Sequence, residues 1–192
     1  TTLLRCLAGV LKPQRGHIDN ALRHSQALLP QDPKALFVCD SVRGELMEWS
    51  TRCGYGQREA AAMARRFGLE SLGARHPYDL SGGQQQKLAL AKLLLANPEV
   101  LFLDEPTKGL DPASCADFSR TVRELADEGK TIVFVTHDLD FAIVTADFVS
   151  MPFDGEIACT EPVQAFFANN IVYRPNAKSR LFGEIAAEGG RA

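Results

Sequence analysis

The sequence lacks paired cysteines, long apolar runs and an excess of positive charge. Its five cysteines are scattered with no CxxC pair, which suits reduced thiols in a cytosolic protein better than a disulfide framework or a zinc site. The most apolar stretch, Leu88–Ala96, is too short to span a bilayer and contains Lys92. The formal net charge of −3 supplies no global basic field, so nucleic acid is not expected as a partner.

The 192 residues are enough for one domain with a sizeable core, and 45% of them are apolar. Strand-like runs alternate with helical patterns, which predicts an α/β fold with helices packed on a parallel sheet. Val100–Leu103 is a bare apolar run between Pro98 and Pro106, and Thr131–Val135 is a second such run. Both are expected to be buried strands.

Helices and turns are predicted from apolar spacing and from cap residues. Apolar residues between Leu3 and Leu11 follow helical spacing, and Asp111-Pro112 begins a helix that Gly129 ends. The other expected elements are a short apolar run at Ala27–Leu29, mostly helix from Ser41 to Asn97 with breaks at Gly54, Gly73 and Pro77, a helix over Asp138–Ala146, and a hairpin around Asp154-Gly155.

Two carboxylates end the first predicted strand, in Asp104-Glu105-Pro106. In a parallel sheet, the carboxyl ends of the strands form the edge at which α/β folds bind ligands. One carboxylate there can hold Mg²⁺, usually through water, while its neighbour polarises an attacking water. Two acids in an ordinary loop after a strand explain Asp104 and Glu105 by themselves equally well.

A glycine-rich segment, Leu80-Ser81-Gly82-Gly83-Gln84, precedes a helical pattern. With a helix from Gln84 onward, Ser-Gly-Gly leaves backbone N–H groups at the positive end of a helix, and such an end binds anions. A flexible turn with Ser81 as the helix cap is the alternative explanation of this segment taken alone.

Together, the two motifs resemble those of the ABC ATPase family, whose signature is LSGGQ and whose Walker B strand ends in Asp-Glu. The resemblance covers nearly the whole chain. It implies a P-loop NTPase fold, with a RecA-like core over residues 1–40 and 99–192 and an inserted helical subdomain over residues 41–98. Further segments resemble the end of the family's Walker A motif, its Q-loop, its D-loop and its switch histidine: Thr1-Thr2-Leu3-Leu4-Arg5, Gln31, Gly109-Leu110-Asp111 and His137.

The resemblance implies ATP and Mg²⁺ as ligands and assigns residues to both. Thr1, Gln31 and Asp104 are the implied metal ligands, and Thr2 would contact the α-phosphate. Glu105 would act as the general base for the attacking water.

The resemblance also implies a second ABC ATPase domain as a partner. His137 would sense the γ-phosphate in the chain's own site, and Asp111 would bridge the dimer. The signature residues would close on ATP held by the partner domain: Ser81, Gly82, Gly83 and Gln84.

Thr1 stands where the family's Walker A motif ends, so the resemblance implies a chain truncated within Walker A, with its N-terminal strands missing. A phosphate cradle needs GxxxxGK before the Thr, because those N–H groups and that Lys hold the β- and γ-phosphates. The 192 residues alone are therefore expected not to hydrolyse ATP.

The stretch after Gln31 looks like that of energy-coupling factor ATPases, which drive vitamin and metal uptake in prokaryotes. This likeness implies a peripheral protein on the cytoplasmic side of the membrane, docked on a membrane T-component. Four residues either border the docking groove or pack the helical subdomain, with both options open: Phe37, Val42, Leu46 and Trp49.

Two other functions compete with an importer motor. A soluble ABC ATPase acting on DNA is disfavoured, because only 50 residues separate Gln31 from Ser81, without the sustained heptads of a coiled coil. The long charged linker of ribosome-acting relatives is not found either. A catalytically silent partner domain is disfavoured because Glu105 and His137 are both present.

Overall fold

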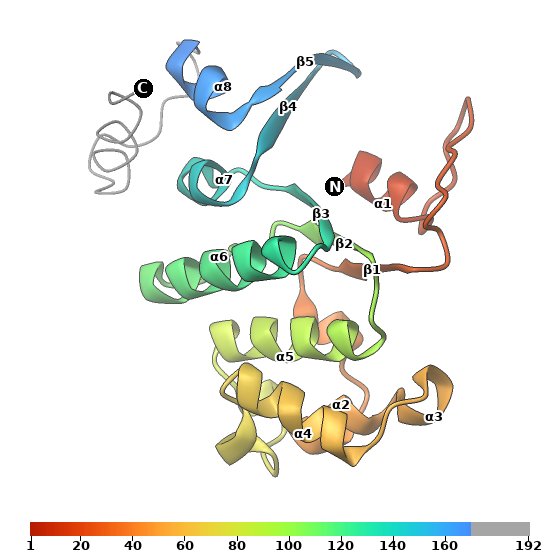
Figure 1. Cartoon of the computed structure of the whole chain (residues 1–192), viewed down its shortest axis with the longest axis vertical. Helices are drawn as coiled ribbons and strands as arrows, with labels where there is room; N and C mark the ends of the chain where they lie inside the picture. The colour runs from red at the N-terminus through yellow and green to blue at the C-terminus, as the bar shows by residue number, and fades with distance from the viewer. Residues whose placement is uncertain (170–192) are drawn as a thin grey trace. The chain divides into compact units, whose positions relative to one another are not determined.

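A computed structural model describes residues 1–169 of the chain (Figure 1). The chain forms two compact units that divide between Val135 and Thr136, and each unit is described by itself. The first unit contains α1 (Thr2–Leu7), β1 (Gln26–Leu29), η1 (Pro33–Leu36), α2 (Val42–Met47), α3 (Ser50–Cys53), α4 (Gln57–Arg66), η2 (Glu70–Leu72), η3 (Pro77–Asp79), α5 (Gly82–Leu95), β2 (Val100–Asp104), α6 (Pro112–Asp127) and β3 (Thr131–Val135). The second contains α7 (Leu139–Thr145), β4 (Phe148–Phe153), β5 (Glu156–Pro162) and α8 (Val163–Asn169).

A parallel sheet with the strand order β1-β2-β3 forms the core of the first unit. Its central strand β2 is buried at every residue, because it is apolar from Val100 to Leu103, ends in the buried Asp104 and has a strand neighbour on each side. The predicted parallel sheet and the predicted buried strand at Val100–Leu103 are therefore confirmed.

The prediction of a second buried strand is wrong in one respect. β3 has the predicted bounds, but Thr131 is exposed and the other four residues are only half-buried. The reason is its place in the sheet, since β3 lies at the edge and pairs with β2 alone.

A helical region covers residues 41–95, in agreement with the helical prediction for Ser41–Asn97. The helices α2, α3 and α4 gather on the side of α5 that faces away from the sheet (Figure 1). Gly54 ends α3 with a φ of 73°, a left-handed conformation that a residue without Cβ adopts easily. The helix expected from Gln84 begins two residues earlier, at Gly82, with Ser81 as its N-cap.

The first helix is shorter than its apolar spacing predicts. α1 ends at Leu7, and Gly9 has a φ of 71°, so the chain leaves the helical path before Val10 and Leu11. Both of these side chains are exposed. Leu4, in contrast, packs with Val100 and Phe102 of β2, which fixes the helix beside the sheet.

The second unit consists of α7, an antiparallel hairpin of β4 and β5, and α8. Asp138 caps α7 by accepting a hydrogen bond from the N–H group of Phe141 at 3.0 Å. Asp154 and Gly155 have φ values of 49° and 84°, the positive pair that suits a tight hairpin turn. The helix and the hairpin predicted here are confirmed, and the part of the tail beyond residue 169 lies outside the described residues.

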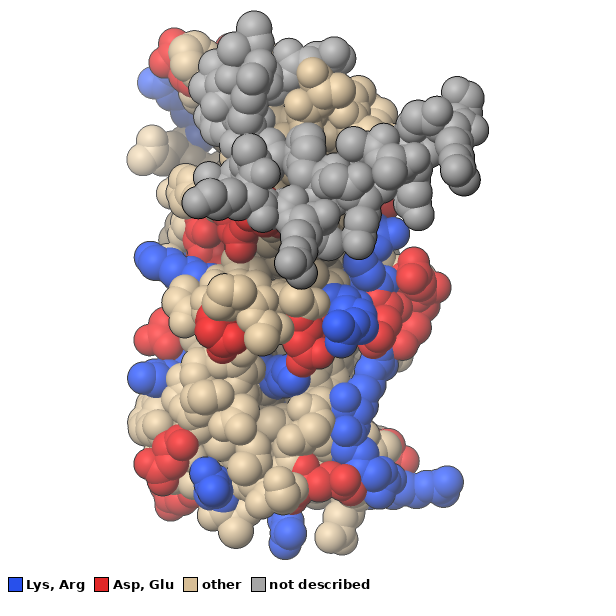
Figure 2. Space-filling view, turned by 90° about the vertical axis from the view of Figure 1, so that its left-hand side faces the viewer, with Lys and Arg blue, Asp and Glu red and all other residues tan. Residues whose placement is uncertain are grey.

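The surface of the described residues carries charges of both signs, and their helices are short. Acidic and basic side chains are interspersed on the face shown in Figure 2, in keeping with the small net charge. Within residues 1–169, no helix combines the length and the apolar character needed to cross a membrane.

Candidate nucleotide site

The site begins at the carboxyl end of β2, where Asp104 is fully buried. The hydroxyl of Thr1 donates a hydrogen bond to Oδ1 of Asp104 at 2.8 Å, although the two residues are 103 positions apart. Packing of Leu4 against Val100 and Phe102 holds the start of α1 at this point. The structure thus brings together two of the three residues expected to hold the metal.

Mg²⁺ binds oxygen ligands and usually keeps several waters, so a site for it needs few protein groups. The second oxygen of Asp104, Oδ2, is buried and has no hydrogen-bond partner. Nε of Arg5 lies 3.5 Å from it and supplies opposite charge. A buried carboxylate with one oxygen that accepts no hydrogen bond, beside a threonine hydroxyl, fits Mg²⁺ as the group that these residues would hold.

No cluster of three or more His, Cys, Asp or Glu side chains suited to a metal occurs among residues 1–169. A cage built by the protein alone is therefore not what this part of the chain offers. The Thr1–Asp104 pair instead suits an ion that is shared with phosphate oxygens and water.

Glu105 follows directly and has a φ of 49°, a left-handed conformation that is strained for a residue with a side chain. Its N–H group donates to the carbonyl of Val135 at 2.9 Å, so β3 holds the turn in place. The side chain is half-buried. Strain of this kind is concentrated at functional sites, which supports a role for Glu105 beyond linking two elements.

The N-terminus of α5 carries the glycine-rich segment. The hydroxyl of Ser81 accepts a hydrogen bond from the N–H group of Gln84 at 3.3 Å, and the Gln84 side chain accepts one from the N–H group of Ser81 at 3.0 Å. This reciprocal pair is a capping box. Ser81 and Gly82 are exposed and Gly83 is half-buried, so another molecule can reach this positive helix end.

Gly83 lies against the start of α6. A Cβ atom at Gly83 would stand 2.8 Å from Oγ and 3.1 Å from Cβ of Ser114. A glycine is therefore required here for close approach of the two helix N-termini. Close packing against Ser114 is thus one reason for a glycine at position 83, in addition to the accessible N–H groups of the segment.

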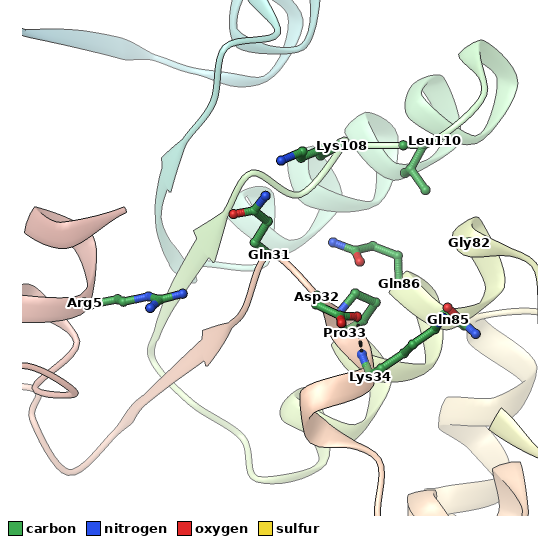
Figure 3. A pocket seen from close by; sticks show the side chains of 11 residues that line it. Arg5, Gln31, Asp32, Pro33, Lys34, Gly82, Gln85, Gln86, Lys108 and Leu110 are labelled. Atoms are coloured by element: carbon green, nitrogen blue, oxygen red, sulfur yellow. Dashed lines mark hydrogen bonds between the residues drawn. The ribbon is translucent and has the colours of Figure 1, made fainter. Parts of the chain in front are cut away.

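An open pocket of about 430 Å³ lies between the segment after β1, the start of α5 and the loop before α6 (Figure 3). Gln31 and Gly82 line the same pocket, as do Arg5 and Lys108. The structure therefore places Gln31 near the signature helix of its own chain.

Asp111 is the N-cap of α6, as predicted. Its carboxylate accepts hydrogen bonds from the Ser114 hydroxyl at 2.6 Å and from the Ser114 N–H group at 3.0 Å. These bonds, the hydroxyl first, lower the pKa of Asp111 below its ordinary value. Asp111 therefore remains a carboxylate at the exposed end of the helix.

For the other two predicted site residues, Thr2 and His137, the structure gives the exposure and the element or unit. Thr2 is the exposed first residue of α1. His137 is exposed and belongs to the second unit, so its proposed place beside Glu105 stays a prediction.

Sequence reasoning missed the partners of three side chains. Arg5 pairs with Asp104, the amide of Gln86 donates to the carbonyl of Pro106 at 2.9 Å, and Lys92 is buried. The available signal was Lys92 itself, since a lone cation in an apolar helix needs a buried counter-charge.

Comparison with known proteins gives the family. The family model described as ABC transporter matches residues 1–108, which is more than half of the chain. The chain belongs to the ABC transporter family of ATP-binding proteins. The P-loop α/β fold expected from the motifs is therefore established, and the site at the end of β2 belongs to an ABC ATPase fold.

Relatives of this ABC family chain come from bacteria and archaea. A protein of Bacillus cereus named as an ABC transporter ATP-binding protein is 39% identical over 187 residues, covering 90% of this chain and 34% of the relative. One from Pyrococcus abyssi is 33% identical and covers 87% of this chain and 70% of the relative. The chain spans about a third of the length of the Bacillus relatives that it matches.

Some relatives carry names linked to specific transport systems. The energy-coupling factor transporter ATP-binding protein EcfA2 of Methanospirillum hungatei is 32% identical and covers 98% of this chain and 52% of the relative. The solved structure of cbiO1 from Clostridium perfringens, described as part of the ABC transporter complex cbiONQ, is 29% identical with a TM-score of 0.77. It covers 88% of this chain and 74% of cbiO1.

Proposed function

We propose that this chain, within the protein expressed from its whole reading frame, binds ATP with Mg²⁺ and hydrolyses it as the motor of an energy-coupling factor importer on the cytoplasmic side of a membrane. The observation that carries the proposal is the Thr1–Asp104 hydrogen bond beside the strained Glu105. The likeness to EcfA2 and cbiO1 supports the importer class.

We assign a task to each residue of the site, from its surroundings or from the family resemblance. Thr1 and Asp104 would hold the ion, which would supply charge stabilisation to the phosphates when bound. Glu105 orients the water and accepts its proton as the general base. Thr2, Gln31 and His137 contact the nucleotide or its ion, which the resemblance implies for these positions.

A second ABC ATPase domain completes the active unit. Ser81, Gly82, Gly83 and Gln84 stand at an accessible positive helix end, which suits the γ-phosphate of ATP bound to the other domain. Asp111 is an exposed carboxylate that is available to bridge the two domains.

The membrane T-component docks on exposed residues of the helical region and of the segment just before it. Of the four residues with two open roles, Phe37, Val42 and Leu46 are buried and Trp49 is half-buried, which supports packing over docking for the first three. Val38 and Tyr78 are 72% and 54% exposed and are the apolar side chains available for contact. We expect Val38→Asp or Tyr78→Asp to abolish co-purification with the membrane subunit, and Val10→Asp, on the exposed segment after α1, to leave it unchanged.

The test of the proposed function is ATP turnover by the protein expressed from its whole reading frame. Glu105→Gln should lower kcat by about 10²–10⁴-fold with ATP binding retained, since a general base contributes rate and not affinity. Glu99→Gln, just before the other end of β2, is the matched control and should leave turnover unchanged. Equal turnover of Glu105→Gln and the unchanged protein would refute the proposal.

The 192 residues alone are a second sample in the same assay. They contain no GxxxxGK segment, so we expect no turnover by them. Turnover comparable to that of the whole reading frame's product would contradict this expectation.

A further inference from the structure

Helix α5 is buried on nearly every side, yet three of its buried side chains are polar: Gln85, Gln86 and Lys92. α5 contacts η1, α2, α4, β1 and α6. The Gln85 amide donates to the carbonyl of Pro77 at 3.1 Å, and the Gln86 amide donates to that of Pro106. Polar side chains therefore attach this helix to the segments around it at fixed points.

Lys92 makes the largest of these attachments. Its side chain is 1% exposed and forms ion pairs with Glu45 and with Glu48, the latter at 2.7 Å. Its third acceptor is the carbonyl of Leu36 at 2.8 Å, and its Nζ lies 4.9 Å from the centre of the Trp49 ring. An ammonium group has three donors, so every donor of this buried cation has an acceptor.

Glu45 is fully buried and uses both of its oxygens. Oε2 meets Lys92, while Oε1 accepts hydrogen bonds from the N–H groups of Val38 and Cys39, both at 2.5 Å. Lys92 thus holds the segment from Leu36 to Cys39 at the Leu36 carbonyl, and Glu45 holds it at the N–H groups of Val38 and Cys39. One buried ion pair fixes this segment on α5.

The stability of the fold alone does not explain the buried ion pair of Lys92 and Glu45. An apolar pair of similar volume is often as stable as a buried ion pair, because desolvation offsets the attraction between the charges. What the pair adds is defined geometry, since three backbone groups and two side chains must meet at set positions.

In the sequence, the segment from Leu36 to Cys39 lies between Gln31 and Ser81, two parts of the proposed nucleotide site. Leu36 ends η1, five residues after Gln31, and α5 begins beside Ser81 and runs about 15 Å from Gly82 to Lys92. We propose that Lys92 and Glu45 are positioning residues that make the Gln31 segment and the Ser81 end of α5 move as one body. The nucleotide roles of those two ends rest on the proposed function, whereas the attachment itself does not.

Hydrogen exchange of the 192-residue chain tests the attachment without nucleotide. In Lys92→Met the Leu36 carbonyl loses its donor and Glu45 loses its counter-charge. We expect exchange at Val38 and Cys39 to become about tenfold faster, because the segment that carries them loses the hydrogen bond from the charged Lys92 to the Leu36 carbonyl. We expect exchange at residues 31–35 and at Gln84 to accelerate with it, while β2 is unchanged.

Lys87→Met is the matched control, because Lys87 lies on the same helix and pairs with Asp117 on α6. It should leave Val38 and Cys39 unchanged. Unchanged exchange at these two amides in Lys92→Met overturns the proposal. So does acceleration by one common factor at every amide, because that result marks general destabilisation.

ATP turnover by the protein expressed from the whole reading frame tests the positioning role of Lys92 and Glu45. The double variant Lys92→Met/Glu45→Gln removes both charges, and the new amide oxygen still accepts from Val38 and Cys39, which keeps the chain folded. We expect kcat to fall about tenfold with KM for ATP changed less than about twofold, because binding is kept and positioning is lost.

The two parts of the proposal fail separately from the proposed function. An unchanged kcat in the folded double variant overturns the positioning role. Absence of turnover in the unchanged protein refutes the proposed function instead, and the hydrogen-exchange result then still decides whether the attachment exists.

Discussion

Gly83 illustrates how one atom can decide the contact between two helices. Gly83→Ala places a Cβ at 2.8 Å from Oγ of Ser114, a distance that forces the start of α5 or α6 to shift. We expect the free energy of unfolding to fall by about 1–3 kcal/mol, as for other overpacked sites. Denaturant titration of the chain measures this change.

Gly82→Ala is the matched control for this effect. A Cβ at Gly82 has its nearest neighbours at 3.8 Å, an ordinary contact distance. We expect it to be neutral or slightly stabilising, since alanine favours a helix more than glycine does. Equal destabilisation by both substitutions would show that the contact with Ser114 is not the cause.

Asp111 provides a test that depends on pH. The Ser114 hydroxyl and N–H group lower the pKa of Asp111, so its charged form stabilises the fold above the unfolded-state pKa of about 3.9. That contribution is lost as the pH falls through the lowered folded-state pKa. We expect Ser114→Ala to raise the pKa of Asp111, as measured by NMR titration of the carboxyl carbon.

Ser119→Ala on the same helix should leave the titration of Asp111 unchanged, because the Ser119 hydroxyl bonds to the carbonyl of Cys115. If Ser114→Ala titrates like the unchanged chain, then the hydroxyl does not stabilise the carboxylate.

Residue types and local order predicted the acidic end of β2 and the cap of α6. They could not predict that the Thr1 hydroxyl meets Asp104, because no local pattern links positions 103 apart, and only the family resemblance placed both at one metal. The partners of Lys92 were missed for the same reason, since Glu45 lies 47 positions earlier. Long-range polar contacts depend on the folded geometry and leave no periodic signal in the sequence.

The boundaries of helices and strands could be predicted where prolines or cap residues mark them. β2 lies between two prolines, and Asp111-Pro112 begins α6 as expected. The end of α1 was missed because apolar spacing continues to Leu11, while Gly9 turns the backbone away from the helix. The partial exposure of β3 could not be predicted either, because an apolar run does not show whether its strand is central or at an edge.

The contact between α4 and the end of α6 gives a prediction at the scale of elements. Arg66 donates to both carboxylate oxygens of Glu128, at 3.1 and 2.6 Å. Both side chains are partly exposed, so we expect a coupling energy of only about 0.2–1 kcal/mol. A double-mutant cycle of Arg66→Met and Glu128→Gln measures it through the free energy of unfolding.

Salt provides the internal check for this pair, because the coupling between exposed charges falls as ionic strength rises. The pair of Arg65 and Glu70 is more exposed and longer, at 3.7 Å, and should show a smaller coupling. A coupling that does not change with salt would mean that packing, not charge, joins the two helices.

For the molecule as a whole, the fold class could be predicted, but the arrangement of its parts could not. Alternation of strands and helices indicates a parallel sheet, whereas the order β1-β2-β3 depends on pairing between Gln26 and Val100, far apart along the chain. The predicted division into residues 1–40 with 99–192 and residues 41–98 stays a prediction. The contacts within the chain divide it into two compact units after Val135.

The two units should differ in local stability, and hydrogen exchange of the 192-residue chain can measure this difference. β2 is buried throughout and paired on both sides, so its amides should exchange only through global unfolding. The hairpin of β4 and β5 has two strands, with Phe148 and Phe153 67% and 73% exposed, and such hairpins are marginally stable. We expect its amides to exchange at least about a hundredfold faster than those of β2, through local opening. Equal protection of β2 and the hairpin would show that the chain unfolds as a single cooperative unit, because local opening of the hairpin would then be no easier than global unfolding.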